Sequence, residues 1–328
     1  MSESNPRITI VGLGLVGGSL GMALRQTEVA GVIVGHDRNR LVGNEAKSKG
    51  AVDKVHWNLI SACEEADLVI LALPLDAIAD TMAAIGPYLR PGCVVMDTAA
   101  VKRPVLDWAA EHLPDKVHFV GADPVPAWVP EHVSGIVAAQ ADLFQGGIIC
   151  VVPSDAAAPE AIELVTGLAA AVGAQPLFLD AAEHDGLRAG VDQMPSLLAL
   201  ALLDSVMRQP TWRELRKIAG ASFEAATRLQ GAQPAGEVQG WLANRENLLR
   251  WLDELTASLG SLRHALDEGQ AEELVERFRA AAQERQNWAA DRQTGDWRER
   301  PETEMPERPG LMETFFGGLW PGRRSKKE

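Results

Sequence analysis

The sequence has little of what marks secreted, membrane-spanning or metal-binding proteins. Its three cysteines, Cys63, Cys93 and Cys150, lie far apart, so we expect small buried side chains in a reducing compartment and neither disulfides nor a metal site. No apolar run reaches the ~18 residues that suggest a membrane span, and no basic segment precedes an apolar one. These absences predict a soluble, cytoplasmic protein.

Positive charge is also scarce. The 31 lysines and arginines are outnumbered by 45 acidic residues, which gives a formal net charge of −14. This excess of negative charge argues against nucleic acid as a main partner. With 328 residues, of which 46% are hydrophobic, the chain is long enough for two domains of ordinary size.

The most informative stretch is residues 8–18, where a strand-forming run leads into a glycine-rich turn and then a helix-forming segment. The glycines have the spacing of a dinucleotide fingerprint: Gly12, Gly14 and Gly17. The first glycine permits a sharp turn, the second lets a pyrophosphate approach the backbone, and the third lets the helix pack closely on the strand. The free amides at the helix start, which include those of Leu15 and Val16, would then face the phosphates.

An acidic residue reinforces this prediction. Asp37 follows a second apolar run, residues 31–35, and lies twenty positions after Gly17, where a carboxylate can bind both ribose hydroxyls of NAD. Its charge would repel the 2′-phosphate of NADP, although Arg38 and Arg40 would partly offset that repulsion. The sequence therefore favours NAD over NADP.

Strand-like and helix-like segments alternate over the first part of the chain. Further strands are predicted at residues 52–56, 67–73, 93–96, 117–121, 147–152 and 176–179, and helices at 40–48, 75–89, 102–112 and 159–171. This order predicts a dinucleotide-binding domain over residues 1–180, with a doubly wound, Rossmann-type parallel sheet. Ligands of such sheets bind beyond the carboxyl ends of the strands, so Leu73, Pro74 and Thr98 are predicted cofactor contacts.

The strand signal disappears after Asp180. Helices are predicted at residues 181–207, 211–229, 237–266 and 271–291, which gives an all-helical substrate and dimerisation domain over 181–292 and a flexible tail over 293–328. Leucines at alternating spacings of four and three mark one helix face: Leu248, Leu252, Leu255, Leu259, Leu262 and Leu266. This stripe is the core face of a bundle, a subunit interface, or both if two chains share one bundle. The apolar and basic end of the tail is read as frayed or self-docking rather than as a membrane or partner contact.

Several separated segments, taken together and in order, resemble the prephenate and arogenate dehydrogenases of tyrosine biosynthesis. The matching segments are VGLGLVGGSL (11–20), LALP (71–74), DTAAVK (97–102), FVGADP (119–124), ADLFQG (141–146), EHD (183–185), MP (194–195), TR (227–228) and LANRE (242–246). The resemblance implies a dinucleotide-binding domain followed by an all-helical domain that forms the dimer. It also implies oxidative decarboxylation of a cyclohexadienol, in which a hydride passes to the nicotinamide while a base takes the hydroxyl proton.

The sequence departs from the family pattern at residues that would contact the substrate. Ala100 replaces a usual serine, Asp123 replaces a usual histidine before proline, and residues 192–196 read DQMPS where the family has Ser-His-Leu-Pro-His. Lys102, His184, Asp185, Pro195 and Arg228 are retained.

The predicted catalytic residues are therefore Asp123, Gln193 and Arg228. Asp123 could serve as the base, although an unperturbed aspartate has a pKa of about 3.9, which suits neutral pH poorly. Arg228 would bind a substrate carboxylate, with a surface pair to Glu224 as the alternative. If Asp123 and Asp192 face the pocket, the acidic site favours arogenate, which carries an ammonium, over the dianion prephenate.

Other interpretations stay open. The His184–Asp185 pair is read as a helix cap rather than a catalytic pair, and Lys102 as either a structural residue or one near the cofactor. His132 is a loop residue or a replacement base. The whole protein could also be an NAD-binding relative that has lost turnover and acts as a sensor or partner subunit, or a dehydrogenase for a different substrate.

Overall fold

The computed structural model describes residues 6–27, 29–129, 134–229, 234–295 and 297. The chain separates into two compact units, and the division falls between Leu248 and Leu249. His132 and the predicted tail beyond residue 297 lie outside the described residues. In the part of the chain that is described, no helix is long and apolar enough to cross a membrane.

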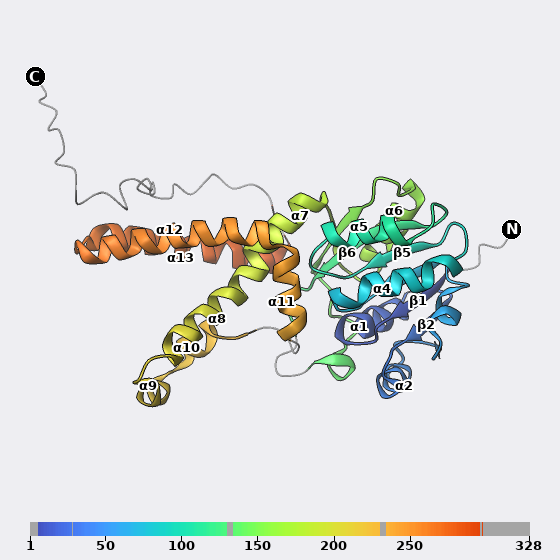
Figure 1. Ribbon diagram of the computed structural model, residues 1–328, viewed down its shortest axis with the longest axis horizontal. Helices are drawn as coiled ribbons and strands as arrows, with labels where there is room; N and C mark the ends of the chain where they lie inside the picture. The colour runs from blue at the N-terminus through green and yellow to red at the C-terminus, as the bar shows by residue number, and fades with distance from the viewer. Residues whose placement is uncertain (1–5, 28, 130–133, 230–233, 296, 298–328) are drawn as a thin grey trace, which may run out of the picture. The chain divides into compact units, whose positions relative to one another are not determined.

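The first unit contains an eight-stranded sheet in the order β3-β2-β1-β4-β5-β6-β7-β8 (Figure 1). The strands are β1 (Arg7–Val11), β2 (Val32–His36), β3 (Lys54–Val55), β4 (Leu68–Leu71), β5 (Val94–Asp97), β6 (His118–Val125), β7 (Ile148–Pro153) and β8 (Gln175–Phe178). β1 to β6 are parallel, as predicted, but β7 pairs with β6 in the antiparallel direction. A parallel pair needs a crossover helix, and the described part of the β6–β7 connection holds only the 3₁₀ turn η2 (Gly135–Ala138).

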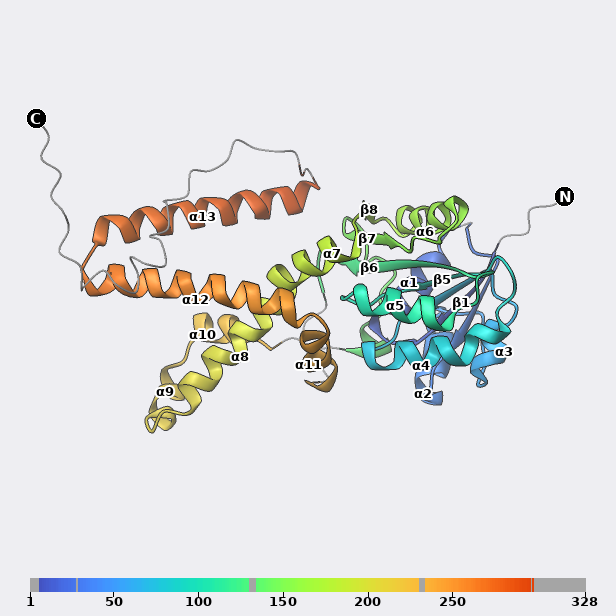
Figure 2. The same cartoon turned by 45° about the horizontal axis from the view of Figure 1, so that its top comes forward.

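Helices cover both faces of this sheet. They are α1 (Leu15–Leu24), α2 (Arg40–Ser48), α3 (Leu59–Cys63), α4 (Leu75–Ile85) with the 3₁₀ turn η1 (Gly86–Tyr88), α5 (Arg103–His112) and α6 (Pro159–Ala171). Along β4, Leu68 and Ile70 join the core beneath α1 and α6, whereas Val69 and Leu71 join the core beneath α3, α4 and α5. This alternation is why the strand reads as a continuous apolar run. Figure 2 shows α6 and α4 on opposite sides of the strands.

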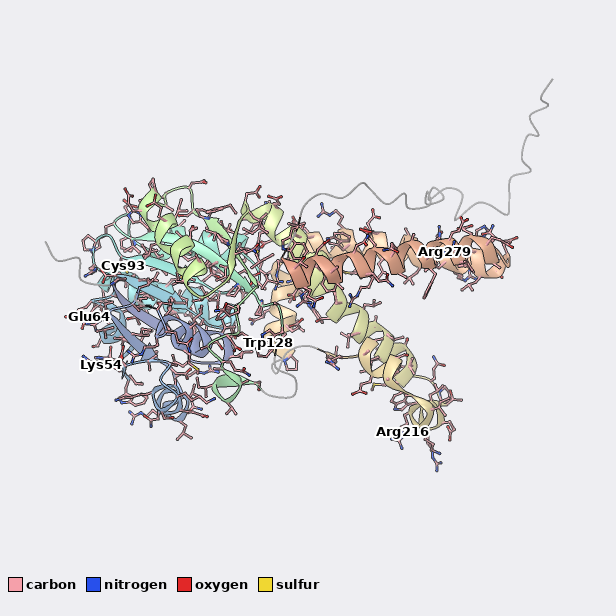
Figure 3. The ribbon with its side chains drawn as sticks, turned by 180° about the vertical axis from the view of Figure 1, so that it is seen from behind. Lys54, Glu64, Cys93, Trp128, Arg216 and Arg279 are labelled. Carbon is pink, nitrogen blue, oxygen red and sulfur yellow. The ribbon has the colours of Figure 1, made fainter. Side chains whose placement is uncertain are left out.

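The three cysteines are all buried and free, as predicted. Burial raises the pKa of the Cys63 and Cys93 thiols to about 12, so both are protonated at neutral pH. These thiols therefore act as small hydrophobic side chains of the α/β core (Figure 3).

Three of the four helices predicted after Asp180 are broken into shorter ones, whereas the fourth, predicted at residues 271–291, is confirmed as one helix. The structure has α7 (Ala181–Arg188), a π-helical turn η3 (Ala189–Gln193), α8 (Met194–Met207), α9 (Trp212–Ile218), α10 (Ala221–Ala226), α11 (Pro234–Ala243), α12 (Arg245–Asp267) and α13 (Ala271–Thr294). Pro195 has no N–H to continue the hydrogen-bond ladder, so the turn before it widens. Asn244 ends α11, with its side chain hydrogen-bonded to the Asp185 carbonyl at 2.8 Å.

The leucine stripe is not a closed core of one chain. Leu248 is buried, but Leu259 and Leu266 are 53% and 68% exposed. On α13, Phe278 is 78% exposed and lines a shallow groove with Arg279. These exposed apolar side chains favour the interface interpretation of the stripe.

Candidate active site

The glycine turn after β1 has the conformation that the fingerprint predicts. Gly12 has a φ of +91°, and its N–H donates to the His36 carbonyl at 2.8 Å. A Cβ on Gly12 would lie 2.2 Å from the Ala72 carbonyl oxygen, and a Cβ on Gly17 would lie 2.0 Å from the Gly12 oxygen. Both positions therefore require glycine on steric grounds alone.

Gly14 is different, because a Cβ there would meet nothing within 4 Å. It is the N-cap residue of α1, which has no side-chain cap and no acidic residue in its first turn. The first amides of α1, at Leu15 and Val16, therefore border open space with the positive end of the helix dipole. This arrangement fits a pyrophosphate.

Asp37 lies half-buried after β2 and is held beside this turn. Its Oδ2 accepts the N–H of Leu13 at 2.9 Å, and its Oδ1 accepts the N–H of Asn39 at 2.8 Å. Each oxygen keeps a second lone pair for a ribose hydroxyl. Arg38 and Arg40 are exposed, and the Arg40 guanidinium lies over the Trp57 ring at 5.4 Å, an arrangement that the sequence did not indicate.

A cavity of about 240 Å³ lies at the carboxyl ends of β4 and β5. Its walls come from the loops after these strands, from η3 and from α11: Leu73, Leu75, Thr98, Ala99, Ala100, Val101, Asp192, Gln193, Gly236, Glu237, Gly240 and Trp241. The predicted contacts Leu73 and Thr98 thus meet the predicted catalytic residue Gln193. Pro74, between two lining residues, is exposed.

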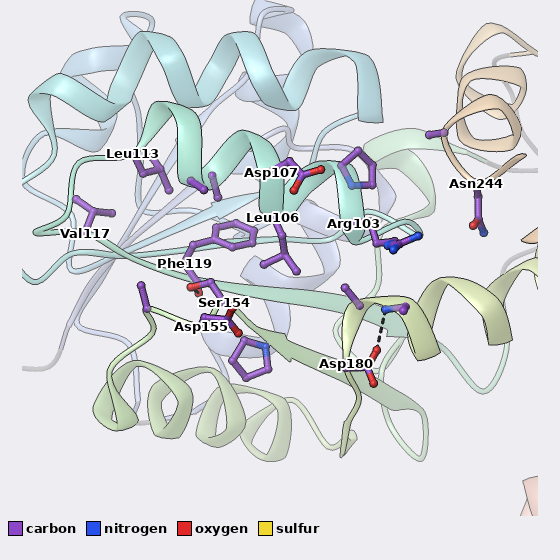
Figure 4. A pocket seen from close by; sticks show the side chains of 18 of the residues that line it. Arg103, Leu106, Asp107, Leu113, Val117, Phe119, Ser154, Asp155, Asp180 and Asn244 are labelled. Atoms are coloured by element: carbon purple, nitrogen blue, oxygen red, sulfur yellow. Dashed lines mark hydrogen bonds between the residues drawn. The ribbon is translucent and has the colours of Figure 1, made fainter. Parts of the chain in front are cut away.

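A larger hollow of about 970 Å³ runs along α5 and β6, and its labelled lining residues include Asp107, Phe119, Asp155 and Asn244 (Figure 4). It contains none of the predicted cofactor or catalytic residues. Its size therefore does not make it the candidate active site, and the smaller cavity at the strand ends is the better candidate.

Asp123 does not form part of the wall of the smaller cavity, at the ends of β4 and β5. It is 2% exposed and is not among the lining residues. Its Oδ2 lies 3.1 Å from His184 Nε2 and 2.9 Å from Arg188 Nε, the latter as an ion pair whose angle is poor for a hydrogen bond. Arg188 also lies 3.1 Å from Asp192 through Nη2, so it joins Asp123 to the cavity wall.

His184 and Asp185 do not cap their own helix, because Asp180 accepts the first amides of α7. Asp185 instead accepts the N–H groups of Lys102 at 2.6 Å and Arg103 at 2.9 Å, at the start of α5. The prediction that the pair caps its own helix is therefore wrong: Asp185 caps α5, and His184 caps neither helix.

His184 contacts a carboxylate through each of its two ring nitrogens, and these contacts fix its charge. Its Nδ1 lies 2.8 Å from Asp185 Oδ1, while its Nε2 faces Asp123. Burial alone would lower the pKa of His184, but the hydrogen bonds to Asp123 and Asp185 raise it to about 10. The buried ring is thus an imidazolium at neutral pH.

Lys102 has a structural position. Its Nζ donates to Asp97 at 2.5 Å and to the Ala122 carbonyl at 2.8 Å, and both charged side chains are fully buried. Burial raises the pKa of Asp97, against the opposing effect of the Lys102 charge. Through these two contacts Lys102 joins the end of β5 to β6.

Gln193 lines the cavity with both ends of its amide engaged. Its Nε2 donates to the Gly240 carbonyl at 3.3 Å, and its Oε1 accepts from Asn244 at 2.9 Å. Gln193 therefore connects η3 to α11. Arg228 is exposed just after α10 and is not one of the residues that line the cavity.

Sequence reasoning missed Arg188, Glu237 and Trp241. Arg188 and Asp192 have the i, i+4 spacing of a helical ion pair, a signal that could have been used. Glu237 and Trp241 share the same spacing on α11 and both line the cavity, but nothing local distinguishes them from other helix residues.

Comparison with known proteins agrees with this architecture. Residues 20–177 match the family described as prephenate dehydrogenase, nucleotide-binding domain, and residues 180–280 match prephenate dehydrogenase, dimerization domain. The prephenate dehydrogenase of Bacillus subtilis is 26% identical over 86% of this chain and 76% of its own. The cyclohexadienyl dehydrogenase of Zymomonas mobilis is 27% identical over 85% of this chain and 94% of its own.

Solved structures show the same fold. The prephenate dehydrogenase of A. aeolicus, in complex with hydroxyphenyl propionate and NAD+, has a TM-score of 0.80 and 25% identity, and the match covers 88% of this chain and 99% of that one. The arogenate dehydrogenase of Synechocystis has a TM-score of 0.73 with 23% identity, over 86% of this chain and 99% of that one. With both of its domains matched, the chain belongs to the prephenate dehydrogenase family.

Proposed function

We propose that this chain is an NAD-dependent dehydrogenase that oxidises and decarboxylates a cyclohexadienol of the prephenate or arogenate type. The observation that carries the proposal is the cavity at the ends of β4 and β5, close along the sheet to the uncapped glycine turn of β1. Relatives with both domains of this chain are named for this reaction. The cofactor assignment rests on Gly14, the α1 amides and Asp37.

The reaction breaks the C4–H bond of the ring and the bond that joins the ring to its carboxylate. The hydride leaves C4, the 4-hydroxyl gives up its proton, and the ring carboxylate departs as CO₂, so that the ring becomes aromatic. When bound, NAD supplies the hydride acceptor. The protein must hold the ring in the cavity, accept the hydroxyl proton and return it to the phenolic oxygen.

Asp192 is the carboxylate best placed to accept this proton. It lines the cavity, whereas Asp123 lies behind it between two cations. Burial raises the pKa of Asp192, with Arg188 acting in the opposite direction and Asp123 adding to the rise. A base with a raised pKa is better matched to neutral pH. We propose that Asp123 positions Arg188 and through it Asp192, and that Gln193 positions α11.

Removal of this base should slow turnover. We expect Asp192→Asn to lower kcat/KM by roughly 10²–10⁴-fold, with NAD binding unchanged. Asp204→Asn serves as the control, because Asp204 forms a comparable i, i+4 pair with Arg208 on the exposed part of α8. If Asp192→Asn kept nearly parental turnover, Asp192 would not be the base, and the sequence-based prediction of Asp123 as the base would be favoured. Arg228 remains the predicted carboxylate ligand on the family resemblance alone.

We also propose a homodimer formed through the leucine stripe. A double substitution of Leu259 and Leu266 by glutamate should dissociate it, because four buried leucines per dimer contribute on the order of 6 kcal/mol or more. Sedimentation equilibrium would measure the mass of parent and variant. Leu41→Glu, at a site that is 76% exposed on α2, is the control and should leave the mass unchanged. A monomeric parent or a dimeric double variant would contradict the proposal.

The function itself is tested with purified protein in four mixtures: NAD or NADP, each with prephenate or arogenate. Formation of reduced nicotinamide with NAD is the expected result. No reduction in any mixture, together with clear NAD binding, would identify a relative that has lost turnover, the alternative suggested by the missing family histidines.

A further inference from the structure

We propose that the cavity selects a substrate whose side chain carries an ammonium group, and that Glu237 is the residue that binds it. This inference rests on the proposed dehydrogenase function and deepens it. It narrows the substrate class from cyclohexadienols in general to those with an amino-acid side chain. From the sequence, this preference is expected of Asp123 and Asp192 together, and Glu237 of α11 takes the place of Asp123 in binding the ammonium.

The charge of the cavity wall is the first observation. Two carboxylates, Asp192 and Glu237, line the cavity, and none of the described lining residues is a lysine, arginine or histidine. The other polar groups of the wall are the hydroxyl of Thr98, the amide of Gln193 and the indole of Trp241. A substrate with two carboxylates and no cationic group would therefore meet like charge in this wall, whereas an ammonium group would meet opposite charge.

The positive charges nearby are already engaged. Arg188 lies between Asp123 and Asp192, at 2.9 Å and 3.1 Å, and the His184 imidazolium lies between Asp123 and Asp185. Asp123 is thus compensated twice, and Asp192 once. The negative charge of Asp123 does not reach a ligand unscreened, so this residue is a poor discriminator between substrates.

Glu237 has no such compensation among the groups that act on its ionisation. Burial raises the pKa of this half-buried carboxyl, hydrogen bonds with Ser196 and Trp241 oppose the rise, and the charge of Asp192 adds to it. Among the described residues, none of the groups that shift its pKa is a cation. A ligand ammonium would supply the missing counter-charge and form a charge-assisted hydrogen bond, which is roughly twice as strong as a neutral one.

The test compares the two substrates, which differ at the side-chain amine or keto group. We expect the parent enzyme to have a higher kcat/KM for arogenate than for prephenate. Glu237→Gln should lower kcat/KM for arogenate by roughly 10- to 100-fold and leave that for prephenate unchanged or higher. Glu237→Asp should retain most of the preference, because it keeps the charge.

A matched control removes a carboxylate elsewhere. Glu111→Gln changes the net charge equally, but Glu111 is exposed on α5 and does not line the cavity. It should leave the ratio of the two kcat/KM values at the parental level. A parent enzyme that prefers prephenate, or a Glu237→Gln enzyme that loses both activities equally, would overturn the proposal.

Binding provides a readout that does not need turnover. L-Tyrosine and 4-hydroxyphenylpropionate differ only in the ammonium group. Calorimetric titration of each compound into the NAD-loaded protein therefore measures the contribution of the ammonium group to the binding free energy. Glu237→Gln should weaken tyrosine alone, and equal weakening of both, or of neither, contradicts the proposal. If the parent reduces no nicotinamide with either substrate, the dehydrogenase function fails, while this titration still decides whether the cavity recognises an ammonium.

Discussion

Substitution of Lys102 by methionine is expected to lower the free energy of unfolding by about 3–5 kcal/mol. Lys102 and Asp97 are both fully buried, and the Lys102 ammonium is the counter-charge of this carboxylate. Without it, Asp97 either stays ionised in an apolar environment or takes up a proton, and each outcome costs free energy. The side chain of methionine fills most of the lysine volume, so lost packing contributes little.

Urea unfolding followed by circular dichroism would measure this loss. The double variant Lys102→Met, Asp97→Asn should recover much of it, because the amide keeps an acceptor for the Ala99 N–H, which now donates to Asp97 at 2.9 Å. Lys54→Met is the matched control, since Lys54 is exposed on β3 (Figure 3) and should change stability by less than about 0.5 kcal/mol. A Lys102→Met protein as stable as the parent would show that the buried pair contributes nothing.

The parts of the fold that follow from local pattern could be predicted from the sequence. The glycine turn was predictable because Gly12 has a positive φ and Gly17 leaves no room for a Cβ against the Gly12 oxygen, and strands such as β4 because both of their faces are covered. The reversal of β7 was not predictable in this way. The described part of the β6–β7 connection holds no crossover helix, although the length of the connection alone would have allowed one.

The candidate site was less predictable, because its charges are paired across distant elements. Asp185 contacts the start of α5 across 83 residues of sequence, and Asp123 contacts His184 across 61. Family resemblance marked these residues as retained or replaced, but not what each one touches. Arg188 and His184 compensate the negative charge of Asp123, whereas no such pair is seen for Glu237 among the described residues. This difference depends on three-dimensional contacts that the spacing of residues in the sequence does not reveal.

The strongest pH dependence of stability should come from His184. Its pKa is about 10 in the folded chain and 6.5 without its neighbours, so the folded state holds a proton that the unfolded chain releases between these values. The stabilisation is fully present below about pH 6.5 and is lost as pH rises through about 10. At about 1.36 kcal/mol per pKa unit, this amounts to roughly 3–5 kcal/mol.

Unfolding free energies of parent and His184→Gln at several pH values between 6 and 10 would measure this effect. The parent should lose stability across this range, and the variant, which cannot titrate there, should lose much less. His264→Gln, at an exposed position on α12, should keep the parental slope. The outcome also bears on the proton acceptor, because an imidazolium has no lone pair for a hydroxyl proton. A parent whose stability did not fall with pH would mean a neutral His184, and Asp123, with only the Arg188 cation beside it, would again be a candidate for the proton acceptor.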